Sequence, residues 1–142
     1  MNGLVRQRAR LTRVRRIQHG LAASAAAEAA ERVAMLETNR ERLLTMRREL
    51  RPIEGPTSGA ALARMAELAM RLDTARCGLD PSIENARAHA ASLEGEQRAA
   101  RRDQESAEKL EAAAVGLAED MAERRLQQMA RRRRRTNQGE DA

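Results

Sequence analysis

Two histidines and one cysteine are the residues of this chain best suited to chemistry. His19 and His89 could bind a metal or carry protons, and Cys77 could act as a nucleophile or a metal ligand. The two histidines fall in separate predicted helices, and the helix pairing described below separates them by roughly 35 Å. Cys77 has no histidine or second cysteine within helical reach, and a lone cysteine forms no intramolecular disulfide. We therefore predict no catalytic, cofactor-binding or metal site, and no enzymatic activity.

Five consecutive arginines, Arg131–Arg135, could bind a polyanion electrostatically. The chain contains no Phe, Trp or Tyr, so it lacks the aromatic side chains on which single-stranded bases usually stack. No heptad repeat follows a basic helix in the order that a basic zipper requires. Nucleic acid is therefore not the expected partner.

The composition indicates the elements that carry these residues. The chain has 142 residues and is 42% hydrophobic, but this apolar content is mostly Ala and Leu. Small and medium side chains suit the narrow seam between paired helices better than a thick core. The formal net charge is +6, and no apolar run is long enough to span a membrane. We therefore predict an elongated all-α coiled coil that is cytoplasmic and does not insert into a membrane.

Two clusters of helix-breaking residues divide the sequence. The segment 51–59 contains two prolines and two glycines, and Gly78 and Pro81 form a second break. The long helices on either side of the breaks match in length, so the chain can close as an antiparallel hairpin. Whether the short helix folds back or continues into the next one is left open. The prediction is a single hairpin domain, 1–135, with helix 4–50, turn 51–59, short helix 60–77 and helix 81–134, followed by a disordered tail, 136–142.

The apolar spacing suggests a register for this hairpin. In the first helix the seam follows Leu11, Val14 and Leu21, and a four-residue stutter then carries it to Leu36 and Leu43. The seam of the second helix also slips once, near Leu110. If paired residue numbers add to about 132, Leu11 lies opposite Met121 and Leu43 near Ala90. A hairpin that is monomeric on its own is preferred, and a parallel dimer of extended chains is the rival.

In that register both chain ends meet, and arginines gather at one pole of the hairpin with almost no acid nearby. A pole of this kind suggests an acidic partner, although charged termini that aid solubility are the simpler interpretation. The candidate contact residues are Leu4, Val5, Arg6, Arg8, Arg10, Arg13, Met129, Arg131, Arg132 and Arg133.

The arrangement from Leu4-Val5-Arg6, through the break at 51–59, to the basic end at 121–135 resembles the FliJ family of flagellar export proteins and the related stalks of type III secretion. The resemblance implies a cytoplasmic helical hairpin beside the inner membrane. Its open end enters the hexameric export ATPase, and it also contacts the cytoplasmic domain of the export-gate membrane protein and export chaperones. The choice between a flagellar system and an injectisome stays open.

The family's gate-docking surface is a helical stripe just after the break. The positions here that could match it are Met65, Ala69, Leu72 and Arg76. The alternative is that this stripe packs on the hairpin tip. Besides the stalk, two other functions are kept as alternatives: a basic coiled-coil rod that binds nucleic acid or another polyanion, and a general coiled-coil scaffold.

Overall fold

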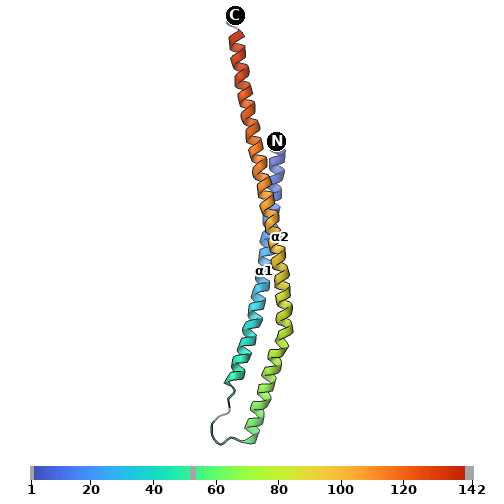
Figure 1. The fold of residues 1–142 in the computed structure, drawn as a ribbon, viewed down its shortest axis with the longest axis vertical. Helices are drawn as coiled ribbons and strands as arrows, with labels where there is room; N and C mark the ends of the chain where they lie inside the picture. The colour runs from blue at the N-terminus through green and yellow to red at the C-terminus, as the bar shows by residue number, and fades with distance from the viewer. Residues whose placement is uncertain (1, 52–53, 140–142) are drawn as a thin grey trace. The chain divides into compact units, whose positions relative to one another are not determined.

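Two long helices packed against each other make up the computed structural model of the chain, which confirms the predicted all-α helical hairpin (Figure 1). The structure describes residues 2–51 and 54–139. Helix α1 is Asn2–Glu49 and helix α2 is Gly59–Gly139. The chain divides into two compact units. Unit 1 is Met1–Leu21 with Arg98–Ala142, and unit 2 is Ala22–Gln97.

Helix α2 is continuous where a break was predicted. It runs through Gly78 and contains Pro81 in its interior, so one helix replaces the two predicted at 60–77 and 81–134. A proline inside a helix costs about 3 kcal/mol because it removes a hydrogen bond and clashes with the preceding turn. Packing next to the proline offsets part of this cost, because the side chain of Ile83, two residues later, is almost fully buried. Helix α2 also extends to Gly139, into the segment 136–142 that was predicted to be disordered; residues 140–142 lie outside the described residues.

The connection between the helices contains a cap for α2. The backbone N–H of Ala61 donates to the hydroxyl of Ser58 at 3.2 Å, and Ser58 also accepts through its carbonyl oxygen. This is the expected role of a serine just before a helix begins. Gly55 has a φ of +129°, which glycine alone adopts readily. Pro52, part of the predicted turn, lies outside the described residues.

Ion pairs fix the register of unit 2. Arg47 Nε lies 3.1 Å from Asp73 Oδ2, and Arg40 Nε lies 3.2 Å from Asp80 Oδ1, so the numbers in both pairs add to 120. Arg87 and Glu37, whose numbers add to 124, approach to 2.6 Å. The register that adds to 132 is therefore wrong by about ten residues, and Leu43 is not level with Ala90.

Unit 1 has the same register. Arg15 Nη1 lies 3.1 Å from Asp103 Oδ2, and Arg16 Nε lies 3.0 Å from Glu108 Oε1. Their numbers add to 118 and 124. Leu11 is therefore not opposite Met121.

The seam between the helices shows neither of the predicted slips. The covered positions of α1 keep alternating steps of three and four throughout, which is an unbroken heptad. In unit 1 they are Val5, Arg8, Thr12, Arg15 and His19, and in unit 2 they are Ala22, Ala26, Ala29, Val33, Leu36, Arg40, Leu43 and Arg47. Leu50, just after the end of α1, continues the same spacing.

Helix α2 behaves in the same way. Its heptad passes Leu110 without a slip and continues through Gln104, Ala107, Glu111, Ala114 and Ala118. Alanines are buried in the seam, where the prediction placed leucines. Arginines also occupy seam positions: their aliphatic chains pack between the helices, and their guanidinium groups reach water. Leu11, Val14, Leu21 and Leu110 are consequently exposed.

Candidate functional site

The predicted basic pole is divided in the structure. Arg6, Arg8 and Arg10 lie on the paired part of α1, whereas Arg131–Arg135 lie on α2 beyond the level of Asn2. The register places Arg6 and Arg131 roughly 20 Å apart along the helices of unit 1. Figure 1 shows the end of α2 extending past the N-terminal end of α1. The structure therefore does not bring the two arginine groups together.

The arginines of α1 face acids instead. Arg15 and Arg16 are paired with Asp103 and Glu108 of α2. The stretch 103–123 contains seven carboxylates and one lysine. The prediction of a pole with almost no acid nearby is wrong, because the shift in register replaces the C-terminal arginines by this acidic stretch.

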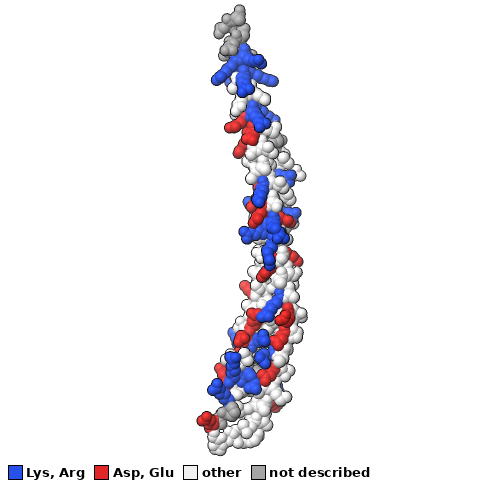
Figure 2. Space-filling view, in the orientation of Figure 1, with Lys and Arg blue, Asp and Glu red and all other residues white. Residues whose placement is uncertain are grey.

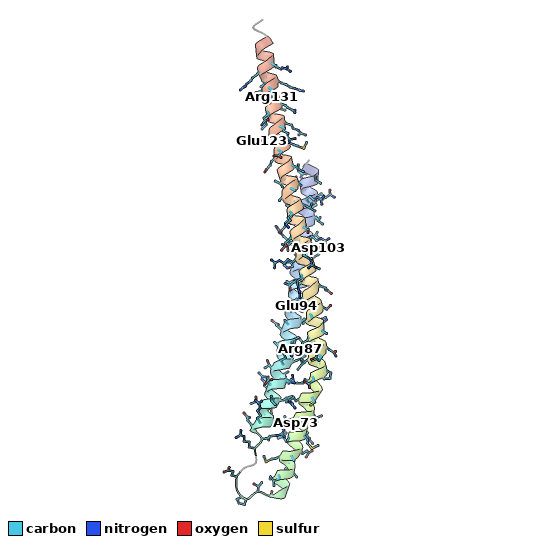
Figure 3. The ribbon with its side chains drawn as sticks, viewed as in Figure 1. Asp73, Arg87, Glu94, Asp103, Glu123 and Arg131 are labelled. Carbon is cyan, nitrogen blue, oxygen red and sulfur yellow. The ribbon has the colours of Figure 1, made fainter. Side chains whose placement is uncertain are left out.

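The C-terminal part of α2 is a single exposed helix. Every residue from 119 to 135 is exposed, and no residue of α1 is level with most of this segment. We call residues 122–135 the α2 extension. It ends in Arg131–Arg135, and Figure 2 shows this positive charge gathered next to the undescribed residues. Figure 3 labels Glu123, near the start of the extension, and Arg131, where the run of arginines begins.

The apolar residues of the extension are well exposed too. Leu126 and Met129 lie three residues apart on one side of the helix and have no cover from α1. Of the predicted pole residues, Leu4 is exposed and Val5 is half-buried in the seam. The extension therefore combines cationic and apolar side chains on a helix with a free surface, which suits contact with an acidic protein surface.

The predicted gate stripe faces inward. Met65, Ala69, Leu72 and Arg76 are successive seam positions of α2, and Leu72 is only 8% exposed. The Nε of Arg76 is buried without a hydrogen-bond partner. A side chain that packs on α1 cannot dock a partner without opening the hairpin. The packing interpretation describes Leu72, and docking of a partner through these four residues stays a prediction.

Exposed apolar residues that the sequence reasoning missed lie on both sides of this inward stripe. Leu68 and Met70 are exposed, and Met70 lines a shallow depression with Glu67 and Thr74. The signal was available, because residues one before or one after an inward heptad position point to the side or outward.

Cys77, His19 and His89, the residues best suited to chemistry, lie in three separate places. Cys77 is exposed, and His19 occupies a seam position with its Nε2 buried and unpaired. His89 borders an open groove of about 330 Å³ between the helices of unit 2, beside Arg32 and Asn85. Within residues 2–51 and 54–139, no group of three or more His, Cys, Asp or Glu residues is placed to hold a metal ion. In the same part of the chain no helix is both long and apolar enough to cross a membrane.

Electrostatic effects are concentrated at the pairs between helices. Hydrogen bonding to Glu37, followed by the charge of that carboxylate, raises the pKa of Arg87 above its ordinary value. Hydrogen bonds from Gln104 and then from Arg16 lower the pKa of Glu108. These shifts stabilise charged forms that already exist at neutral pH, so they maintain the pairing and prepare no group for proton transfer.

Comparison with known protein families, curated proteins and solved structures finds no match for this chain.

Proposed function

We propose that this protein is a non-enzymatic coiled-coil stalk of a flagellar or type III export apparatus. In this role the α2 extension enters the hexameric export ATPase, and the protein works in the cytoplasm beside the inner membrane. The supporting observation is the extension itself: an exposed helix with Leu126, Met129 and five terminal arginines that continues past the paired region. A single helix can enter an opening that is too narrow for two.

The remaining contacts of the proposal are with the export gate and the export chaperones. Because the inward stripe of α2 packs against α1, the proposal assigns the gate contact to Met70 and Ala75, which line a shallow depression on another side of the helix. Apolar burial of these side chains would contribute roughly 25 cal/mol per Å².

The direct test uses the export ATPase of the same cell. The full chain should bind the ATPase and raise its activity or hexamer assembly, and Leu126→Asp with Met129→Asp should abolish both effects. Met70→Asp is the matched control, because it also adds charge at an exposed methionine but lies in unit 2. Equal loss in both variants, with helicity retained, would count against entry of the extension.

A second function is favoured by one observation, the exposure of Arg131–Arg135 on an unpaired helix segment. A polyanion-binding rod would bind duplex DNA with an affinity that falls steeply with salt, by about 0.9 log units per log unit of salt for each phosphate contacted. Neutralising these arginines should remove the salt dependence. DNA binding without ATPase binding would favour this second function.

A further inference from the structure

Unit 1 carries a second apolar heptad besides the seam of the hairpin. On α1, Leu4, Leu11 and Leu21 are exposed, together with Val14. Each precedes a seam position by one residue, so they share the three-four pattern of the seam, with Gln7 and Gln18 at the two remaining positions. A helix with one neighbour needs one such seam, whereas two seams are typical of a helix packed in a larger bundle.

Helix α2 has the matching feature. Leu110 and Leu117 each precede a seam position by one residue, with Ala113 between them. In an antiparallel pair, positions offset in the same direction from the two seams lie on the same side of the pair. The apolar residues of both helices therefore form one surface, which we call the leucine face: Leu4, Leu11, Val14, Leu21, Leu110, Ala113 and Leu117.

The leucines of the two helices also lie at similar positions along the helix axes. Leu11 with Leu110, and Leu4 with Leu117, have numbers that add to 121, within the range of the ion pairs of unit 1. Each pair is therefore level to within about 5 Å. These four side chains remain 38–57% exposed.

The seam between the helices of unit 1 buries few large apolar side chains, whereas the leucine face exposes several. Among the described residues, the buried side chains of this seam are Thr12, Ala107 and Ala114. The hydroxyl of Thr12 is satisfied by donating to the carbonyl oxygen of Arg8 at 3.1 Å. The larger apolar side chains of unit 1 thus lie outside its seam, and their burial requires another surface.

We propose that this surface is the leucine face of a second copy of the chain. The charges beside the face favour this occupant. Residues 2–21 carry six arginines and no acid, whereas residues 100–119, which are level with them in the register of unit 1, carry five carboxylates, two arginines and one lysine. A two-fold axis parallel to the helices sets α1 of each copy beside α2 of the other, so every neighbouring pair has opposite charge and like charges lie on the diagonals.

The proposed dimer has a modest size. A pair of helices about 18 residues long presents a face about 27 Å long and about 20 Å wide, so roughly 1,000 Å² is buried over both copies. Specific interfaces start near this size, and the dimer is therefore expected to depend on concentration. The sequence predicted a monomer because the hairpin closes on itself, but closure leaves the leucine face uncovered. This inference does not rest on the proposed function.

Sedimentation of the full chain across the micromolar range tests the proposal. The wild-type chain should dimerise, and Leu110→Gln or Leu117→Gln should raise the dissociation constant about a hundredfold, because each substitution removes one leucine from each copy at about tenfold per leucine. Leu126→Gln on the extension and Met70→Gln in unit 2 are matched controls that should leave dimerisation unchanged. Circular dichroism checks that each variant keeps its helicity. A chain that stays monomeric, or a dimer lost only with Leu126→Gln, overturns the proposal.

Crosslinking between differently tagged copies tests the arrangement in the dimer. In a Cys77→Ser background, one copy carries Leu11→Cys and the other carries Leu110→Cys, so a bond between the two thiols must join two chains. This mixture should crosslink, whereas copies that both carry Leu11→Cys should not. Efficient crosslinking of Leu11→Cys to itself, without the mixed product, would place α1 beside α1 and overturn the charge argument.

Discussion

Arg16 and Glu108 join the two helices of unit 1: the guanidinium Nε donates to Oε1 of the carboxylate at 3.0 Å. The same oxygen accepts a 3.0 Å hydrogen bond from the side-chain amide of Gln104, one turn earlier on α2. Gln104 and then Arg16 stabilise the charged carboxylate, so the pKa of Glu108 lies below its ordinary value. Although the pair is exposed to solvent, it links residues 92 positions apart in the chain.

We expect this pair to make stability depend on acid pH. Because the pKa of Glu108 is lower in the folded chain, its contribution is present above the unfolded pKa and is lost as the pH falls through the folded pKa. Glu108→Gln should therefore remove stability at neutral pH and flatten the acid limb of a urea-midpoint profile. Glu105→Gln is the control, because Glu105 pairs with Arg101 on the same helix at 3.0 Å. Identical profiles for the two variants would show that the pair between helices contributes nothing.

Replacing Gly78 with alanine should stabilise the protein. In a continuous α2, Gly78 has a helical backbone, and an added Cβ would meet nothing within 4 Å. Alanine in such a position is favoured by about 0.5–1 kcal/mol. The urea midpoint of Gly78→Ala should therefore rise.

The opposite result would restore the predicted break. A glycine that ends a helix in the left-handed conformation is destabilised by alanine. Gly55→Ala shows this behaviour for comparison, because Gly55 has a φ of +129°. If Gly78→Ala lowers stability as Gly55→Ala is expected to do, α2 is interrupted before Pro81.

Ile83 is the residue of unit 2 whose truncation should cost most. Its side chain is 1% exposed, and Ile83→Ala should lower the free energy of unfolding by about 2–3 kcal/mol, at the lower end of the range for buried positions. Met70, at 70% exposure, is the control, and Met70→Ala should change it by less than about 0.5 kcal/mol. Chemical unfolding of both variants measures the difference. Equal small effects would mean that Ile83 is not at the helix interface.

Composition predicted the fold class because an Ala-rich, aromatic-free chain has few ways to bury its apolar surface except between helices. The register was not predictable from the same residues. Leu11, Val14 and Leu21 form a better apolar heptad than Thr12, Arg15 and His19, so the sequence appeared to require a stutter. The structure has none, because the phase of Val33 and Leu36 continues through Ala29 and Ala26 without interruption.

The candidate site depended on this register. A shift of about ten residues moved Arg131–Arg135 past the end of α1 and placed acids beside Arg15 and Arg16. The sequence left packing and docking of the stripe at Leu72 both open for a related reason: an apolar heptad predicts a contact but does not tell whether the contact is made within the chain or with a partner. Only the position of α1 answers that question.

The measurement that tests the central claim most directly is intramolecular crosslinking in unit 2. In a Cys77→Ser background, Glu37→Cys with Arg87→Cys should be joined within one chain by a short thiol crosslinker, because the native side chains approach to 2.6 Å. Leu43→Cys with Ala90→Cys, level in the register that adds to 132, should stay unlinked across roughly 15 Å. Crosslinking of the second pair instead of the first would contradict the register, and products formed only between chains would contradict the hairpin.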